Sequence, residues 1–189
     1  MNPQTHAKQL VFPSQLGWMG LIISSDELAR TQIEYLTFGH PTAELAEQAV
    51  AHGSLTKSVL ARQRLELDHK TDPELRDWIG RLQEFASGRF ADLSLLRLNL
   101  GSLSNFGRQV IEACRNVSWG ETASYGELAR RVGSPAASRA VGGVMARNRH
   151  PLVVPCHRII ASNGALVGFS APEGTQMKKR LLHNERSRD

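Results

Sequence analysis

The chain has few cysteines and no long hydrophobic run. Its two cysteines, Cys114 and Cys156, lie far apart among 189 residues, which excludes a CxxC pair and a disulfide-stapled secreted scaffold. Seven scattered histidines form no zinc-type spacing with them, so we expect no structural metal. Because neither a secretory leader nor an apolar run of transmembrane length is present, we expect a cytoplasmic protein with reduced thiols and no membrane partner.

Acidic residues are scarce in the second half of the chain. Residues 1–100 hold 10 Lys and Arg against 12 Asp and Glu, a balance of −2, whereas residues 101–189 hold 13 against 6, a balance of +7. Neutralisation of phosphates by Lys and Arg supplies most of the non-specific affinity for nucleic acids. The asymmetry favours a polyanionic partner for the C-terminal half, although a merely solvated basic surface would have the same composition.

The first 100 residues show the pattern of a small sheet with helices. Three short apolar runs over residues 9–38 are separated by turn-forming residues, which predicts three strands in an antiparallel meander. Residues 41–52 are rich in Ala and Glu and predict a helix. A second helix is expected to begin at Asp72 or Asp77, because apolar residues recur after them at helical spacing. Residues 53–70 are polar and predict a variable connection without an assigned function.

The segment after the second helix is expected to end the N-terminal domain. Residues 91–100 alternate loosely and could add a strand that closes the sheet, and residues 101–105 are rich in turn formers. We therefore predict an α/β (α+β) chain of two domains. Residues 1–100 would form a small antiparallel sheet with helices, and residues 101–189 a mostly helical domain.

A helix capped by Ser104 or Asn105 is expected to open the C-terminal domain. Its apolar residues recur at spacings of four, four and three, which places them on one face: Phe106, Val110, Cys114 and Val117. On this pattern Cys114 is a buried structural thiol.

Residues 124–147 predict a helix-turn-helix. One short helix spans residues 124–132, a glycine-containing turn follows, and Pro135 at a first-turn position opens the second helix. Such a pair also occurs as an ordinary packing unit. Within a helix, Gly142 and Gly143 cost roughly 1 kcal/mol each relative to alanine, so another helix or DNA is expected to approach the backbone closely.

Three polar residues, Cys156, His157 and Arg158, interrupt the apolar run of residues 152–160. Local contradictions of this kind mark functional sites. A thiol is mostly protonated at neutral pH, and a nucleophilic thiolate needs a nearby base or positive charge, which His157 and Arg158 could supply. The pair alone could equally be a buried cysteine beside an interior histidine.

The wider string around Cys156 resembles the O6-alkylguanine-DNA alkyltransferase family. The family's hallmark Pro-Cys-His-Arg stands intact at residues 155–158. Further positions match in order and spacing over residues 104–185: Tyr125 to Ala129, Arg139 to Gly143, Asn148, Pro151, Leu181, Leu182 and Glu185.

This resemblance implies direct-reversal DNA repair. The protein would act as a methylated-DNA–protein-cysteine methyltransferase on double-stranded DNA, transferring an alkyl group from O6-alkylguanine to Cys156 after the base is flipped out from the minor groove. Each molecule would act once, as a monomer and without a cofactor. Activity on O4-alkylthymine and cooperative assembly on DNA stay open. The family also implies a ribonuclease-H-like roll in residues 1–100 and an alkyltransferase domain in residues 101–189.

The resemblance also carries over residue roles. Cys156 would be the acceptor, His157 would take its proton through a bridging water, and Glu185 would orient the imidazole. Three more residues complete the implied catalytic set, as brace, proton donor and electrostatic aid to the thiolate: Asn148, Tyr125 and Lys178. Arg139 would enter the base stack, and the implied DNA-binding set is Arg139, Tyr125, Ala136, Ala137, Ser138 and Arg147. The implied substrate pocket contains Pro151, Ile159, Val167, Phe169 and Ser170.

Two departures and two rival functions accompany the resemblance. Phe169 stands where many members have tyrosine, and residues 171–174 make a longer loop, which leaves the preferred alkyl size open. A damage sensor of the alkyltransferase-like kind would flip the base without transferring the alkyl group, but Cys156 is retained. A cysteine hydrolase would need an oxyanion hole, for which the sequence shows no signature.

Overall fold

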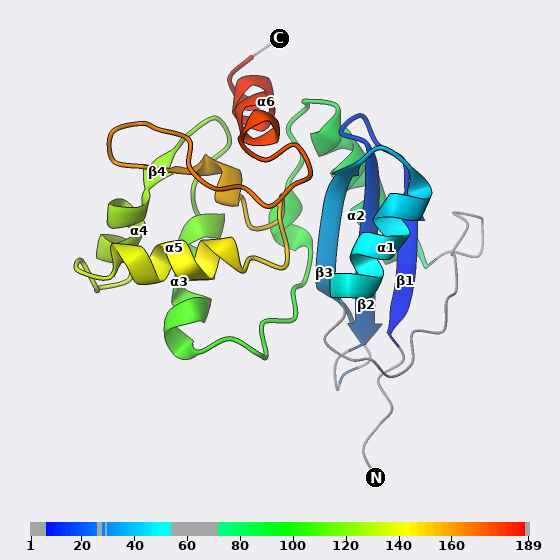
Figure 1. Cartoon of the computed structure of the whole chain (residues 1–189). Coiled ribbons are helices and arrows are strands. Elements are labelled where there is room, and N and C mark those ends of the chain that lie inside the picture. Colours follow the sequence, from blue (N-terminus) through cyan, green and yellow to red (C-terminus); the bar gives the residue numbers. More distant parts are fainter. Residues whose placement is uncertain (1–6, 26–27, 29, 54–71, 188–189) are drawn as a thin grey trace. The chain divides into compact units, whose positions relative to one another are not determined.

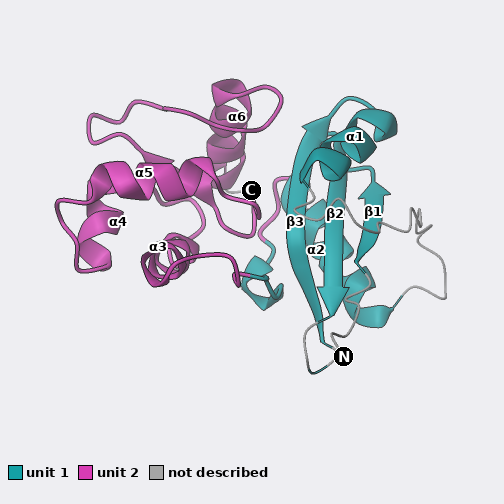
Figure 2. Ribbon diagram, turned by 60° about the horizontal axis from the view of Figure 1, so that its bottom comes forward, with its two compact units in different colours: residues 1–87, 91–99 teal, residues 88–90, 100–189 magenta. Residues whose placement is uncertain are grey.

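The computed structural model describes residues 7–25, 28, 30–53 and 72–187 (Figure 1). These residues belong to two compact units (Figure 2): Met1–Ser87 with Ala91–Asn99 form unit 1, and Gly88–Phe90 with Leu100–Asp189 form unit 2. The α/β class is confirmed, with the described strands of unit 1 forming a three-stranded sheet and unit 2 being mostly helical. The assignment of a ribonuclease-H-like roll to residues 1–100 and of an alkyltransferase domain to residues 101–189 stays a prediction.

An antiparallel meander forms the sheet of unit 1, as the apolar runs predicted. Its strands are β1 (Lys8–Phe12), β2 (Trp18–Ser25) and β3 (Thr31–His40), in the order β1-β2-β3. Gly17 ends the turn between β1 and β2 with φ +97°, and a Cβ there would lie 2.8 Å from the His40 carbonyl oxygen. Only glycine satisfies both demands.

Two helices cover opposite faces of this sheet (Figure 2): α1 (Ala43–Gly53) and α2 (Pro73–Ala86). The Asp72 carboxylate accepts hydrogen bonds from the first backbone amides of α2, and Pro73 follows it, so the helix begins at Asp72 rather than Asp77. The predicted connection over residues 53–70 lies outside the described residues except for Gly53, which ends α1.

The predicted strand over residues 91–100 is wrong. The Asp92 carboxylate accepts hydrogen bonds from the amide and hydroxyl of Ser94 and starts a short 3-10 helix, η1 (Leu93–Leu95). Beyond it a single bridge joins Leu98 to Ile33 at the edge of β3. The local cap therefore outcompetes extension, and the segment meets the sheet at one position only.

The described residues of unit 2 form four α-helices and a two-stranded parallel ladder. The helices are α3 (Asn105–Arg115), α4 (Tyr125–Arg131), α5 (Ser138–Ala146) and α6 (Thr175–Arg186), and the strands are β4 (Ala123–Ser124) and β5 (Ile159–Ile160). The hydroxyl of Ser104 caps α3, and Cys114 is fully buried within it, as expected. Among the described residues no helix has both the length and the apolar character needed to cross a bilayer.

The two helices predicted over residues 124–147 are present, but the second starts later than expected. Ser124 and Glu127 form a reciprocal capping box at the start of α4, and Gly133 at φ +70° follows its end. The Ala137 amide then bonds the Ser134 carbonyl oxygen at 2.8 Å, so Pro135 belongs to a turn, and α5 begins at Ser138. The proline fits a turn as well as a helix start, and its neighbours decide between them.

Candidate active site

Cys156 opens a short 3-10 helix, η2 (Cys156–Arg158), and its side chain is buried. Asn148 fixes the segment before it. The Asn148 Nδ2 donates to the Val154 carbonyl oxygen at 3.0 Å and lies 3.2 Å from Cys156 Sγ, while Oδ1 accepts the His150 amide at 3.0 Å. One amide side chain thus holds both the backbone turn and the sulfur atom.

A buried ionic cluster lies next to the thiol. The His157 Nε2 and Glu185 Oε1 are 2.7 Å apart, and the Arg158 guanidinium donates to both oxygens of Glu185 at 2.9 to 3.1 Å. The Gly120 amide adds a hydrogen bond to Glu185 Oε2 at 3.1 Å. Glu185 comes from α6 and the other two side chains from η2, so the cluster ties the last helix to the cysteine segment.

The charge states follow from this geometry. Burial opposes ionisation of Glu185, but the hydrogen bonds from His157 and Arg158 outweigh it and lower its pKa to about 2. A carboxylate can only accept, so His157 Nε2 must carry a proton, and Nδ1 is then the basic nitrogen of the neutral ring. Burial lowers the pKa of His157 despite the hydrogen bond that its ring donates to Glu185.

Cys156 rests as a thiol. Burial raises its pKa, and the hydrogen bond from Asn148 and the charge of Lys178 offset that rise in part. The sulfur therefore needs a proton acceptor at the moment of reaction.

Lys178 is fully buried and braces the backbone. Its Nζ donates to the Ile159 carbonyl oxygen at 2.6 Å and to the Val167 carbonyl oxygen at 3.1 Å. It thereby joins β5 to the loop of residues 161–174. Burial lowers the pKa of Lys178.

A cavity of about 760 Å³ opens over the thiol. The predicted site residues that line it are Cys156, Tyr125, Ser138, Arg139, Val167, Phe169 and Ser170. Seven further residues line it, and of these only Gly168 belongs to a segment predicted to form the pocket, the loop of residues 164–170: Gly126, Gly142, Met145, Ala146, Ala161, Ser162 and Gly168. Burial raises the pKa of Tyr125, so its hydroxyl stays protonated and can donate.

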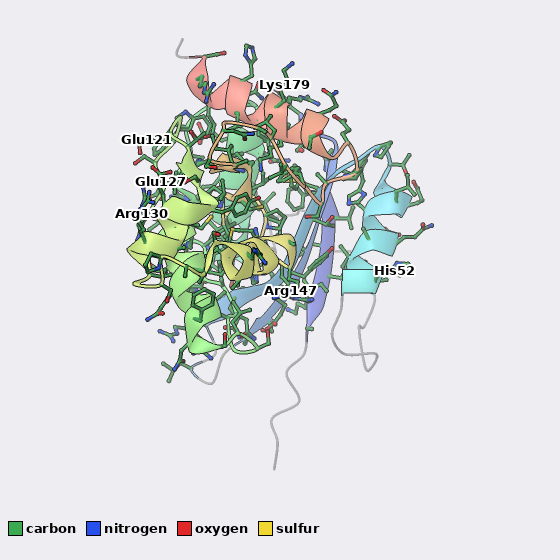
Figure 3. The ribbon with its side chains drawn as sticks, turned by 60° about the vertical axis from the view of Figure 1, so that its left-hand side comes forward. His52, Glu121, Glu127, Arg130, Arg147 and Lys179 are labelled. Atoms are coloured by element: carbon green, nitrogen blue, oxygen red, sulfur yellow. The ribbon has the colours of Figure 1, made fainter. Side chains whose placement is uncertain are left out.

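The other residues predicted to bind DNA or form the pocket do not line this cavity. Pro151 and Ile159 are buried, and Ile159 offers its carbonyl oxygen to Lys178 instead. Ala136 and Ala137 belong to the turn before α5. Arg147 follows the end of α5 (Figure 3). Its guanidinium lies near Gly143, where an added Cβ would be 3.5 Å from Arg147 Nη2.

Arg158 is the residue whose role sequence reasoning missed. The sequence offered it only as a possible positive charge beside the thiol and as part of the motif, although a guanidinium in an apolar run needs a buried acceptor. That requirement was the available signal, and Glu185 fulfils it. No group of three or more His, Cys, Asp or Glu side chains suited to a metal ion occurs within the described ranges.

Comparison with known proteins gives concordant results. Residues 105–187 match the family model described as 6-O-methylguanine DNA methyltransferase, DNA binding domain. The constitutive methylated-DNA–protein-cysteine methyltransferase of Bacillus subtilis is 40% identical over 119 residues, which cover 63% of this chain and 70% of that protein. The methylated-DNA–protein-cysteine methyltransferase of Mycobacterium bovis is 32% identical over 166 residues, which cover 82% and 94%.

Solved structures agree with these relatives. The O6-methylguanine methyltransferase of Mycobacterium tuberculosis matches with a TM-score of 0.69 and 26% identity over 97% of this chain and 94% of that one. A structure of the Mycobacterium tuberculosis protein in complex with DNA matches with a TM-score of 0.65 and 25% identity over 95% and 93%.

Proposed function

Since the chain belongs to the methylated-DNA–protein-cysteine methyltransferase family, we propose that it repairs DNA by moving the alkyl group of O6-alkylguanine onto Cys156. The observation that carries this proposal is the placement of the Cys156 thiol at a cavity shared with Tyr125 and Arg139, beside a buried His157–Glu185 pair. The substrate is alkylated double-stranded DNA, and the protein acts on it as a monomer.

The proton of the thiol goes to His157. Glu185 holds the ring through Nε2, which directs the basic Nδ1 to the acceptor role, with a bridging water as in the family. The proton leaves as the sulfur attacks, because burial keeps Cys156 protonated beforehand. His157 thus supplies the base that the resting thiol lacks.

The transfer exchanges one bond for another. A bond forms between Cys156 Sγ and the alkyl carbon, and the bond between that carbon and guanine O6 breaks with its electron pair going to the base. The Tyr125 hydroxyl, kept protonated by burial, donates a proton to the departing guanine. The product is a stable thioether, so each molecule acts once.

The base must leave the duplex to react. Cys156 is only 7% exposed, and a stacked guanine cannot bring its O6 substituent to a thiol at that depth. Flipping from the minor groove costs a few kcal/mol, which Arg139 offsets by taking the place of the extruded nucleotide. The small residues Ala136, Ala137 and Ser138 let α5 approach the sugar-phosphate walls, and Arg147 adds a phosphate contact.

Mass spectrometry tests the transfer. After equimolar mixing with a duplex that contains O6-methylguanine, the peptide with Cys156 should gain one CH2, and Cys156→Ala should gain none. Cys114 is the matched control, because burial raises its pKa well above the usual range and the described cavity does not include it. The Cys114→Ala variant should therefore react as the parent does. Lesion binding without a mass gain would reject transfer and favour a damage sensor.

A further inference from the structure

Arg158 is held from several sides inside unit 2. Its Nε and Nη2 donate to Glu185, its Nη1 donates to the Val117 carbonyl oxygen at 2.7 Å, and its guanidinium lies 5.8 Å from the Trp119 ring centroid. Only 8% of the residue is exposed. A side chain so fixed does not line the cavity, so it can act on the reaction only through its neighbours, of which Glu185 makes the most hydrogen bonds to it.

Glu185 divides its two oxygens between a permanent cation and an imidazole. Oε1 accepts from His157 and twice from Arg158, and Oε2 accepts from Arg158 and from the Gly120 amide. A carboxylate has about four lone-pair sites, so these contacts saturate it. Because Arg158 neutralises the carboxylate, Glu185 does not require a second positive charge on His157.

The charged groups that face His157 act in opposite directions. Glu185 on α6 favours the protonated ring, whereas Arg158 on η2 and Lys178 on α6 disfavour it. Cys156 beside it is a neutral thiol at rest. Without Arg158 the buried negative charge of Glu185 would be balanced most readily by a second proton on His157, and a protonated ring cannot accept the thiol proton.

We propose that Arg158 is a positioning residue that keeps His157 neutral, and therefore able to accept the Cys156 proton, by neutralising and orienting Glu185. This inference rests on the proposed function for its consequence, since a neutral His157 matters only where Cys156 is deprotonated. The guanidinium also lowers the pKa of His157 directly, after burial and against the effect of Glu185.

The pH profile of single-turnover transfer measures this role. In Arg158→Met the midpoint of the acidic limb should rise by about one pH unit or more, the scale on which a nearby charge shifts a titration. That rise corresponds to a rate loss of about tenfold or more below both midpoints. Arg158→Lys keeps the positive charge, so its midpoint should lie much closer to that of the parent than the midpoint of Arg158→Met does.

Arg97 provides the matched control in unit 1. Its guanidinium also pairs with a glutamate, Glu74, at 2.5 Å and lies 5.4 Å from a tryptophan ring, that of Trp78. Arg97→Met should leave the acidic limb where it is. A rate loss in Arg158→Met that is equal at every pH would show a merely structural role and overturn the proposal.

A titration of His157 by nuclear magnetic resonance gives a test that needs neither DNA nor a folded Arg158→Met. In the parent protein His157 should be the neutral Nε2–H tautomer at pH 7. In Arg158→Lys the ring should titrate at a higher pH than in the parent. If Arg158→Met folds, the ring should titrate at a still higher pH in that variant. A doubly protonated His157 at pH 7 in the parent would overturn the proposal. If the parent transfers no alkyl group, the proposed function fails, and this titration still decides the role of Arg158.

Discussion

Replacing Glu185 by glutamine should reduce stability in a way that depends on pH. The folded protein holds the pKa of Glu185 at about 2, against an ordinary value of 4.5, because hydrogen bonds from His157 and Arg158 outweigh the effect of burial. A carboxylate whose pKa is lower in the folded protein than in the unfolded chain stabilises the fold at pH values above its unfolded-chain pKa. That contribution is lost as the pH falls toward the pKa in the folded protein. At about 1.4 kcal/mol per unit, the difference is worth roughly 3 kcal/mol at pH 7 and about 1.4 kcal/mol at pH 3.

Urea unfolding followed by far-UV circular dichroism at pH 7 and pH 3 measures this contribution. The difference in unfolding free energy between the parent and Glu185→Gln should shrink by about 2 kcal/mol from pH 7 to pH 3. The cost of leaving Arg158 without its carboxylate adds a part that does not vary with pH. The control is Glu74→Gln, whose side chain is 39% exposed in its pair with Arg97, and which should cost less than about 1 kcal/mol. A Glu185→Gln difference equal at both pH values would refute the reasoning.

Two further variants test the proposed role of Arg139 in base flipping and the hydrogen bonds of Lys178 to the backbone. Arg139→Ala should slow transfer from duplex DNA by roughly tenfold or more, because a loss of about 1.4 kcal/mol in the stabilisation of the flipped base is a factor of ten in rate. Alkylation of Cys156 by iodoacetamide should keep its rate. A transfer rate equal to that of the parent would contradict the proposed role of Arg139. Lys178→Met should lower the unfolding free energy by roughly 1–3 kcal/mol, because the Ile159 and Val167 carbonyls lose their donor. Lys179→Met, on the exposed side of α6 (Figure 3), should change it by less than about 0.5 kcal/mol, and similar losses in both variants would contradict the brace.

Much of the fold follows from signals that are local in the sequence. The meander of unit 1 follows from apolar runs separated by turns, and both Asp72 and Ser104 cap the helices they were expected to open. Caps and turns are decided by a few neighbouring residues, so a sequence can specify them without knowledge of the rest of the chain.

The errors occur where two local structures compete. Pro135 suits the first turn of a helix, but the hydrogen bond from Ala137 to Ser134 makes it part of a turn and moves the start of α5 to Ser138. Residues 91–100 alternate well enough for a strand, but the Asp92 cap starts a 3-10 helix first. In both cases the pattern allows either outcome, and a local hydrogen bond selects one.

The support behind the site could not be read from spacing. Glu185 lies 27 residues after Arg158 and 65 after Gly120, and only the folded chain shows that all of them meet. The motif around Cys156 named the candidate reacting side chains by resemblance. It did not reveal that the same arginine anchors Glu185, Val117 and Trp119, or that Lys178 braces two backbone carbonyls.

The raised pKa of Cys156 has a use in the proposed single-use mechanism. Thiolates, not thiols, react with electrophiles and oxidants, so a permanently ionised acceptor would be consumed by reactions that repair nothing. Burial, which raises the pKa of Cys156, keeps the sulfur protonated until a flipped base fills the cavity. The base that must then take the proton is kept neutral in turn, by burial and by the charge of Arg158. Reactivity is thereby confined to the occupied site, and it depends on a buried ionic cluster that also joins α6 to the cysteine segment.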